Sequence, residues 1–184
     1  MATKNNRRIL VTKRILKESL LELMKDKPIS KISIKEICDL SEMSRSTFYL
    51  HYQDQFELLK DMEDEVLEKT FESLEGMGAS LDTIDYIEKF LNYVRSNKET
   101  FGVLLCQPDT EDFQNSILEA VRKRVETSMP EVLQSRIAPY YFSFVMHGSI
   151  NVIRDWIASD FDVETSVIAD FVFKACHGVT TSLA

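Results

Sequence analysis

Residues 33–52, SIKEICDLSEMSRSTFYLHY, have the pattern of two short helices joined by a tight turn. Ser33 and Glu36 have the spacing of a capping box, in which a hydroxyl and a carboxylate satisfy the unpaired amides at a helix start. After a break at residues 41–43, Ser44 is placed as the N-cap of a second helix. Two helices connected in this way form a helix-turn-helix, whose second helix can lie in the major groove of DNA. The stretch therefore predicts a DNA-binding motif.

Charge is distributed unevenly along the chain. The 184 residues carry a formal net charge of −8, from 22 Lys and Arg against 30 Asp and Glu. Residues 1–60 hold 12 of the basic and 8 of the acidic residues, a net of +4, so residues 61–184 have a net of −12. A basic head is drawn towards DNA phosphates, whereas an acidic body is repelled by them. This division agrees with a DNA-binding head, and ordinary variation of surface charge is the alternative interpretation.

Apolar residues recur at helical spacing through almost the whole chain. The expected helices cover residues 9–26, 33–40, 44–51, 54–74, 81–95, 97–106, 110–128, 136–159 and 163–181. No alternating run is long enough to predict a sheet. We therefore predict an all-α fold of about nine helices, with an N-terminal three-helix helix-turn-helix domain before a C-terminal helical bundle domain.

The clearest loop in the chain lies at residues 76–80, where two glycines and a serine interrupt the helical pattern. We place the helix-turn-helix domain at residues 8–59, a connecting helix and loop at 60–80, and a second helical domain at 81–184. The last two expected helices are joined by a short connection, so they should pack antiparallel.

Composition argues against several other classes of protein. The 44% hydrophobic and 28% charged residues are typical of a soluble globular protein. No apolar run is long enough to span a bilayer, and the N-terminus lacks the apolar core of a signal peptide. Three scattered cysteines imply no disulfide framework and favour a reduced, cytoplasmic setting. Because no P-loop, G-x-G-x-x-G, G-x-S-x-G or H-E-x-x-H motif occurs, we expect no enzyme, no metal site and no cofactor.

Residues 8–59 resemble the DNA-binding domain of the tetracycline-repressor (TetR) family of bacterial regulators. The resemblance rests on ISIKEIC at residues 32–38, on SRSTFYLHY at residues 44–52, and on the leucine pair at 58–59. The string S-R-x-T-F-Y-x-H-[FY] is highly specific for this family. The remainder of the chain resembles the family in architecture, with about six further helices and a tryptophan in the penultimate one. A bacterial protein that joins the nucleoid when bound to DNA is the implied setting.

The resemblance assigns DNA contacts to the helix-turn-helix. Arg45 stands in the first turn of its second helix, where it can contact guanine O6 and N7 with two hydrogen bonds. Tyr49 resembles a phosphate contact of the family, and His51 and the amides near Gln55 resemble further clamps on the DNA backbone. The predicted DNA-binding residues are Ser33, Ser44, Arg45, Ser46, Thr47, Tyr49, His51 and Gln55.

Two positions depart from the family pattern. Glu42 stands where the turn commonly has glycine, and because a positive φ strains other residues we expect a slightly different turn geometry. Gln55 replaces a common lysine at the start of the fourth helix, which removes one cationic phosphate contact and should make the salt dependence shallower by about one charge. We expect Phe48 and Tyr52 to pack against helices one and four. Basic residues that could compensate along the DNA backbone or in the minor groove, or form a solvated tail, are Lys4, Arg7, Arg8, Lys13 and Arg14.

In the TetR family the second domain usually encloses a small-molecule pocket, and the last two helices of two subunits build the dimer interface. The resemblance therefore implies a homodimer, bound to double-stranded DNA, that an unidentified small-molecule effector releases from a palindromic operator. The expected pocket residues, each of which could equally be plain core, are Tyr86, Tyr93, Phe101, Phe113, Tyr141, His147 and Trp156. The alternative is a partner-dependent helical regulator whose C-terminal domain binds a protein co-regulator, and activation in place of repression stays open.

Overall fold

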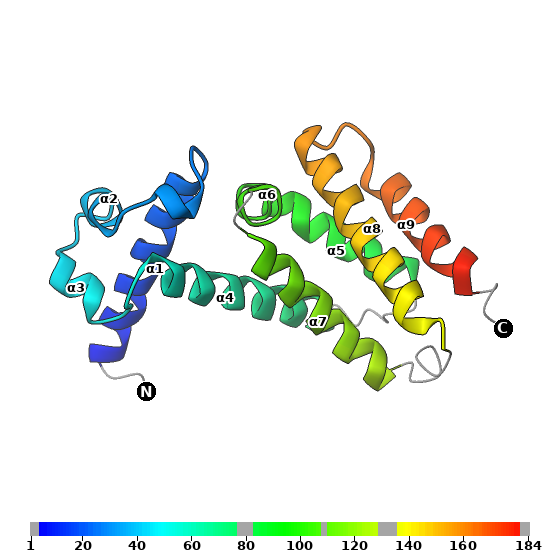
Figure 1. The fold of residues 1–184 in the computed structure, drawn as a ribbon, viewed down its shortest axis with the longest axis horizontal. Coiled ribbons are helices and arrows are strands. Elements are labelled where there is room, and N and C mark those ends of the chain that lie inside the picture. Colours follow the sequence, from blue (N-terminus) through cyan, green and yellow to red (C-terminus); the bar gives the residue numbers. More distant parts are fainter. Residues whose placement is uncertain (1–3, 77–82, 108–109, 129–135, 181–184) are drawn as a thin grey trace. The chain divides into compact units, whose positions relative to one another are not determined.

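The computed structural model describes residues 4–76, 83–107, 110–128 and 136–180, in which nine α-helices, a short 3-10 helix and no strand occur (Figure 1). The helices are α1 (Lys4–Met24), η1 (Ile29–Lys31), α2 (Ile34–Leu40), α3 (Arg45–Tyr49), α4 (Gln55–Gly76), α5 (Ile84–Ser96), α6 (Lys98–Cys106), α7 (Glu111–Ser128), α8 (Ala138–Ala158) and α9 (Thr165–Thr180). The predicted all-α class and the number of helices are confirmed in these described ranges.

The chain forms two compact units, and the boundary between them lies inside α4. One unit contains the chain up to Val66 with a short piece that includes Gln107, and the other contains the rest from Leu67 onward. α4 therefore contributes its first half to one unit and its second half to the other. The connecting segment expected at residues 60–80 begins within the first unit, and most of its predicted loop, residues 77–80, lies outside the described residues.

The core of the first unit holds α3 in place. Leu16, Leu20 and Met24 recur every fourth residue along α1 and have no exposed surface, as expected for one face of a helix. Ile37 of α2 and Phe48 of α3 are equally buried. Fully burying an apolar side chain of this size stabilises the fold by about 1.5–3 kcal/mol. The short α3, which has only five residues, thus depends on burial of Phe48 more than on its own helix propensity.

The end of α1 differs from the expected one. The helix stops at Met24, not near residue 26, and Pro28 precedes the 3-10 helix η1, which sequence analysis missed. Pro28 has φ −64°, a value that proline imposes and that suits the start of a helical turn. The short turn buries Ile29 and Ile32, so tertiary packing stabilises a segment that has no helical repeat of its own.

The turn between α2 and α3 keeps the conformation that usually calls for glycine. Glu42 has φ +54°, in the left-handed region, and the Met43 amide donates to the Cys38 carbonyl at 3.0 Å. The sequence-based expectation of a different turn geometry is therefore wrong. The chain accepts the strained backbone at Glu42 because the helices on both sides are fixed by buried residues.

Replacement of Glu42 by glycine should therefore stabilise the protein. Glycine avoids the cost of about 1–2 kcal/mol that other residues bear at positive φ, but it loses more entropy on folding. We expect the free energy of unfolding in urea to rise by about 0.5–1 kcal/mol. Lys35→Gly, at an exposed position inside α2, is the matched control and should lower it by about 1 kcal/mol. If Glu42→Gly and Lys35→Gly lowered the free energy of unfolding by the same amount, this account of the turn would be wrong.

In the second unit, α8 and α9 lie side by side and antiparallel, as predicted (Figure 1). Trp156 closes the connection between them, because its indole Nε1 donates to the Val163 carbonyl at 2.7 Å. The Trp156 ring also meets Phe161 edge to face at 4.7 Å between ring centroids. α5 packs against α9, and α6 packs against α8.

Candidate nucleic-acid interface

α3 begins at a well-formed cap. The Ser44 hydroxyl accepts a hydrogen bond from the Thr47 amide at 3.1 Å, which satisfies one of the unpaired amides of the helix start. It also lies 2.8 Å from the hydroxyls of both Ser46 and Thr47. Three of the predicted DNA-binding residues thus form a local network that orients the first turn of α3.

α2 begins with the predicted capping box. The Glu36 amide donates to the Ser33 hydroxyl at 3.3 Å, and the Ser33 amide donates to the Glu36 carboxylate at 3.0 Å. The hydrogen bond from Lys27, followed by those from Ser33, lowers the pKa of Glu36 to about 2. Ser33 therefore has a structural role as the N-cap of α2, in addition to any contact with DNA.

The predicted DNA-binding residues all lie in the first unit: at the N-caps of α2 and α3, on α3, just after α3, or at the start of α4. Arg45, Ser46 and Tyr49 are exposed on α3, and Tyr49 is 58% exposed despite its aromatic ring. His51 and Gln55 are half-buried, so less of their side chains can reach a ligand. A large exposed aromatic side chain next to an exposed arginine has no role in the core of the unit. The arrangement suits contact with a partner such as DNA.

Two exposed apolar side chains at this surface had no role in the sequence analysis. Leu50 follows Tyr49 directly and is 80% exposed, and Phe56 at the start of α4 is 51% exposed. Apolar side chains can contact the methyl group of thymine in the major groove. Leu50 does not fit the apolar repeat that packs on the core. This mismatch was the signal in the sequence that could have identified it as a surface residue.

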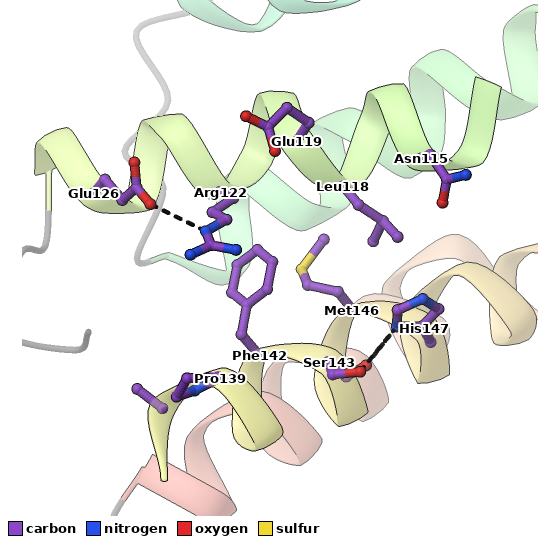
Figure 2. Close-up of a pocket in the computed structure, with 11 residues that line it drawn as sticks. Asn115, Leu118, Glu119, Arg122, Glu126, Pro139, Phe142, Ser143, Met146 and His147 are labelled. Atoms are coloured by element: carbon purple, nitrogen blue, oxygen red, sulfur yellow. Dashed lines mark hydrogen bonds and ion pairs between the residues drawn. The ribbon is translucent and has the colours of Figure 1, made fainter. Parts of the chain in front are cut away.

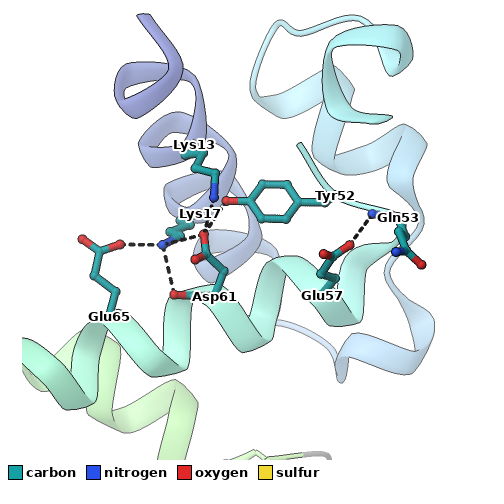
Figure 3. Close-up of polar contacts among 7 residues, drawn as sticks. All are labelled: Lys13, Lys17, Tyr52, Gln53, Glu57, Asp61 and Glu65. Atoms are coloured by element: carbon teal, nitrogen blue, oxygen red, sulfur yellow. Dashed lines mark hydrogen bonds and ion pairs between the residues drawn. The ribbon is translucent and has the colours of Figure 1, made fainter. Parts of the chain in front are cut away.

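Two aromatic residues of the motif instead belong to the interior, as expected. Phe48 has no exposed surface and Tyr52 is 3% exposed. The Tyr52 hydroxyl donates to Asp61 of α4 at 2.6 Å, and Lys13 of α1 lies over its ring (Figure 3). Tyr52 therefore joins helices one and four.

Lys13 was one of the basic residues that could compensate for Gln55 along the DNA backbone or in the minor groove, and the structure gives it a partner within the protein. Its Nζ lies 3.3 Å from the Asp61 carboxylate and 5.0 Å from the centroid of the Tyr52 ring. Among the other candidates, Arg14 pairs with Glu18 on α1 at 3.8 Å. Arg7 and Arg8 are exposed, whereas the side chain of Lys4 lies outside the described residues.

The second unit contains an open groove of about 700 Å³ between α7 and α8 (Figure 2). Leu118 of α7 faces Phe142 and Met146 of α8, which point towards it. Two pairs of polar side chains that line the groove contact each other. Arg122 pairs with Glu126 at 3.0 Å. His147 Nδ1 lies 2.8 Å from the Ser143 carbonyl oxygen.

The aromatic residues expected to form a ligand pocket lie in different places. His147 lines the groove and is exposed, not buried. Phe101, Phe113 and Trp156 are instead buried in the core and do not line it. The half-buried tyrosines 86, 93 and 141 are also absent from its lining. The Tyr141 hydroxyl donates to the Cys176 carbonyl at 2.5 Å, and the ring of Tyr93 packs on that of Phe101.

The described residues hold no group of three or more His, Cys, Asp or Glu side chains suited to a metal ion. None of their helices is both long and apolar enough to cross a bilayer.

A helix-turn-helix whose segment, residues 1–60, has a net charge of +4, joined to a helical unit with an open groove, is the architecture of a DNA-binding transcriptional regulator. The family described as transcriptional regulator C-terminal region (TetR_C_8) matches residues 82–178, more than half of the chain. The chain belongs to the TetR family of transcriptional regulators. The family consists of regulators and not of enzymes, as the sequence analysis predicted.

Individual proteins resemble the chain in sequence or in fold. It is 30% identical over 96 residues to an uncharacterized helix-turn-helix regulator, YxbF, of Bacillus subtilis (strain 168). The match covers 49% of this chain and 25% of that protein, so the chain spans about a quarter of its relative. A TetR regulator from Streptococcus agalactiae 2603V has the same fold, with a TM-score of 0.72, 19% identity, and coverage of 96% and 99% of the two chains. The dihydroxyacetone kinase operon activator DhaS also shares it, with a TM-score of 0.61, 15% identity, and coverage of 95% and 98%.

Proposed function

We propose that the protein is a homodimeric repressor that binds a palindromic operator through α3. The observation that carries this proposal is the exposed Arg45, Ser46 and Tyr49 surface on a capped helix of the helix-turn-helix. Arg45 reads guanine, and Tyr49 with His51 contacts phosphates. A two-fold dimer would present its two α3 helices to successive major grooves, roughly 34–36 Å apart.

An exposed apolar surface on α8 and α9 supports dimerisation through these helices. Tyr140 and Phe144 lie one turn apart on α8 and are 75% and 72% exposed. Val167 and Phe171 lie one turn apart on α9 and are more than half exposed. Large apolar side chains that cluster at helical spacing on a surface usually mark a protein interface. We call these four residues the α8–α9 apolar face.

The groove between α7 and α8 is the proposed effector site. The groove offers a ligand the apolar contacts of Leu118, Phe142 and Met146, and its lining also includes the polar side chains of Asn115 and Glu119. An apolar or aromatic effector fits the apolar part of this lining. A protein co-regulator is the alternative occupant of the groove. Because one protein of the same fold is named an operon activator, activation of transcription stays open as an alternative to repression.

Fluorescence anisotropy with the intergenic DNA that flanks the protein's own gene tests the proposal. We expect saturable binding to one palindromic fragment, with two subunits per site, that weakens steeply as salt is added. Compounds that release the DNA are then tested against Met146→Trp, whose larger side chain narrows the groove between α7 and α8. This variant should bind the operator as the wild type does and lose the response to the compound.

Weak binding that does not depend on sequence would reject the operator proposal and favour the partner-dependent regulator. If Met146→Trp responds to the compound like the wild type, the groove is not the effector site. Derepression of a reporter gene on deletion of the protein separates a repressor from an activator, because loss of an activator lowers expression.

A further inference from the structure

Asp61 of α4 collects three donors on one carboxylate oxygen (Figure 3). The Tyr52 hydroxyl donates to Oδ2 at 2.6 Å, and the ammonium groups of Lys17 and Lys13 lie 2.9 Å and 3.3 Å from the same atom. The donors come from α1 and from the chain just after α3. Asp61 is therefore where three parts of the first unit meet through directional bonds.

This cluster is partly buried, which distinguishes it from an ordinary surface ion pair. Tyr52 is 3% exposed, and the side chain of Lys17 is 11% exposed. Lys17 also donates to the Asp61 carbonyl at 3.0 Å and pairs with Glu65 one turn further along α4. Hydrogen bonds in such surroundings are stronger than in water, and a partner left without its bond there is costly.

The ionisation states suit the bond between Tyr52 and Asp61. Burial, followed by the hydrogen bond to Asp61, raises the pKa of Tyr52 above its ordinary range, so the hydroxyl remains a donor. Burial opposes ionisation of Asp61, but the bonds from Tyr52 and Lys17 and the charges of Lys17 and Lys13 leave its pKa below the ordinary value. Asp61 thus remains an acceptor at neutral pH.

Tyr52 transmits this restraint to α3. Its amide donates to the Phe48 carbonyl of α3 at 3.0 Å, and its ring lies 5.9 Å from the Phe48 ring between centroids. Burial of Phe48 holds α3 on the core, but apolar packing has little directional preference. The hydroxyl-carboxylate bond adds a fixed direction at the end of α3.

We propose that Asp61 is a positioning residue for DNA recognition, which sets the orientation of α3 through the Tyr52 hydroxyl without touching DNA itself. The inference rests on the proposed function, because it concerns how Arg45 and Tyr49 are oriented towards DNA. A small change in the orientation of α3 disturbs hydrogen bonds to base edges more than it disturbs the attraction of basic side chains to phosphate. Sequence-specific binding should therefore suffer more than binding to random DNA.

The test compares Tyr52→Phe, Asp61→Ala and the double variant with the wild type by anisotropy on operator and on random DNA. Tyr52→Phe removes one oxygen atom, so the fold should survive even if Asp61→Ala disturbs it. We expect each single variant to bind the operator about tenfold more weakly, equivalent to about 1.4 kcal/mol, and random DNA within about twofold of the wild type. The double variant should bind the operator no more weakly than the single variant with the larger loss of affinity, since both changes remove the same hydrogen bond.

Asp64→Ala is the matched control. Asp64 lies on the same helix, pairs with Lys60 at 3.1 Å and has a 60% exposed side chain, so its loss removes the same charge without touching α1 or Tyr52. This control should bind the operator within about twofold of the wild type. Operator affinity per folded molecule that is unchanged in Tyr52→Phe, or losses that simply add in the double variant, would overturn the inference.

Hydrogen exchange of the backbone amides separates this inference from the proposed function. If Asp61 positions α3, Tyr52→Phe should speed exchange in α3 while α2 stays as protected as in the wild type. A wild-type protein that binds no DNA fragment would reject the proposed function, and the exchange result would still decide whether the bond orders α3. Unchanged protection of α3 in Tyr52→Phe would overturn the positioning role.

Discussion

Replacement of Arg45 by alanine should lower affinity for the operator by about 10- to 100-fold, which corresponds to about 1–3 kcal/mol for a lost two-hydrogen-bond contact with a base. Arg45 begins α3, its side chain is exposed, and the Ser44 cap orients the turn that carries it. The loss should be largest for the wild-type operator and small for fragments mutated at the guanine that Arg45 reads. Anisotropy against a panel of single base-pair changes measures both effects.

Arg95→Ala is the matched control for the loss of one positive charge. Arg95 lies on α5 in the other unit, half-exposed and 4.0 Å from Glu164, and it is not part of the proposed DNA surface. This variant should retain the wild-type sequence preference. If Arg45→Ala weakened binding to every fragment equally, Arg45 would be a phosphate contact and not a reader of bases.

A glutamate in place of Phe144 should abolish dimerisation and, with it, most of the operator affinity. Phe144 is 72% exposed on the α8–α9 apolar face, so the folded subunit should tolerate the change. In a dimer the same position would be buried, and truncation of such an aromatic anchor typically costs about 2–4 kcal/mol, or roughly 30- to 1000-fold in affinity. The unpaired carboxylate adds a further desolvation cost. Sedimentation velocity measures the oligomeric state, and anisotropy measures the loss of operator binding.

Ile84→Glu provides the matched control, because Ile84 is an exposed apolar residue at the start of α5 and lies outside the α8–α9 apolar face. It should leave the dimer and operator affinity unchanged. Phe171→Glu on α9 should reproduce the effect of Phe144→Glu if both helices form the interface. A dimer that survives both substitutions would show that the subunits associate elsewhere.

Features that depend on neighbouring residues in the chain could be predicted from the sequence. The Ser33 and Ser44 caps each join residues three positions apart, and the buried repeat of Leu16 and Leu20 follows helix geometry. Such interactions have the same spacing in any soluble helical protein, so nine helices and the helix-turn-helix follow from the residues themselves. The exposure of Arg45 and Tyr49 on α3 agrees with this local pattern, although their DNA contacts remain predictions.

Features that depend on residues far apart in the chain required the folded structure. Lys13 and Asp61 are separated by 48 positions. No periodicity in the sequence predicts that Lys13 pairs with Asp61 and does not contact a DNA phosphate. The left-handed backbone at Glu42 is accepted because packing of the flanking helices outweighs the local cost. Whether an aromatic residue joins a groove or the core depends in the same way on which helices meet. Phe101 was therefore a pocket candidate in sequence and is a core residue in the fold, because packing between helices is chosen by shape and burial across the whole unit.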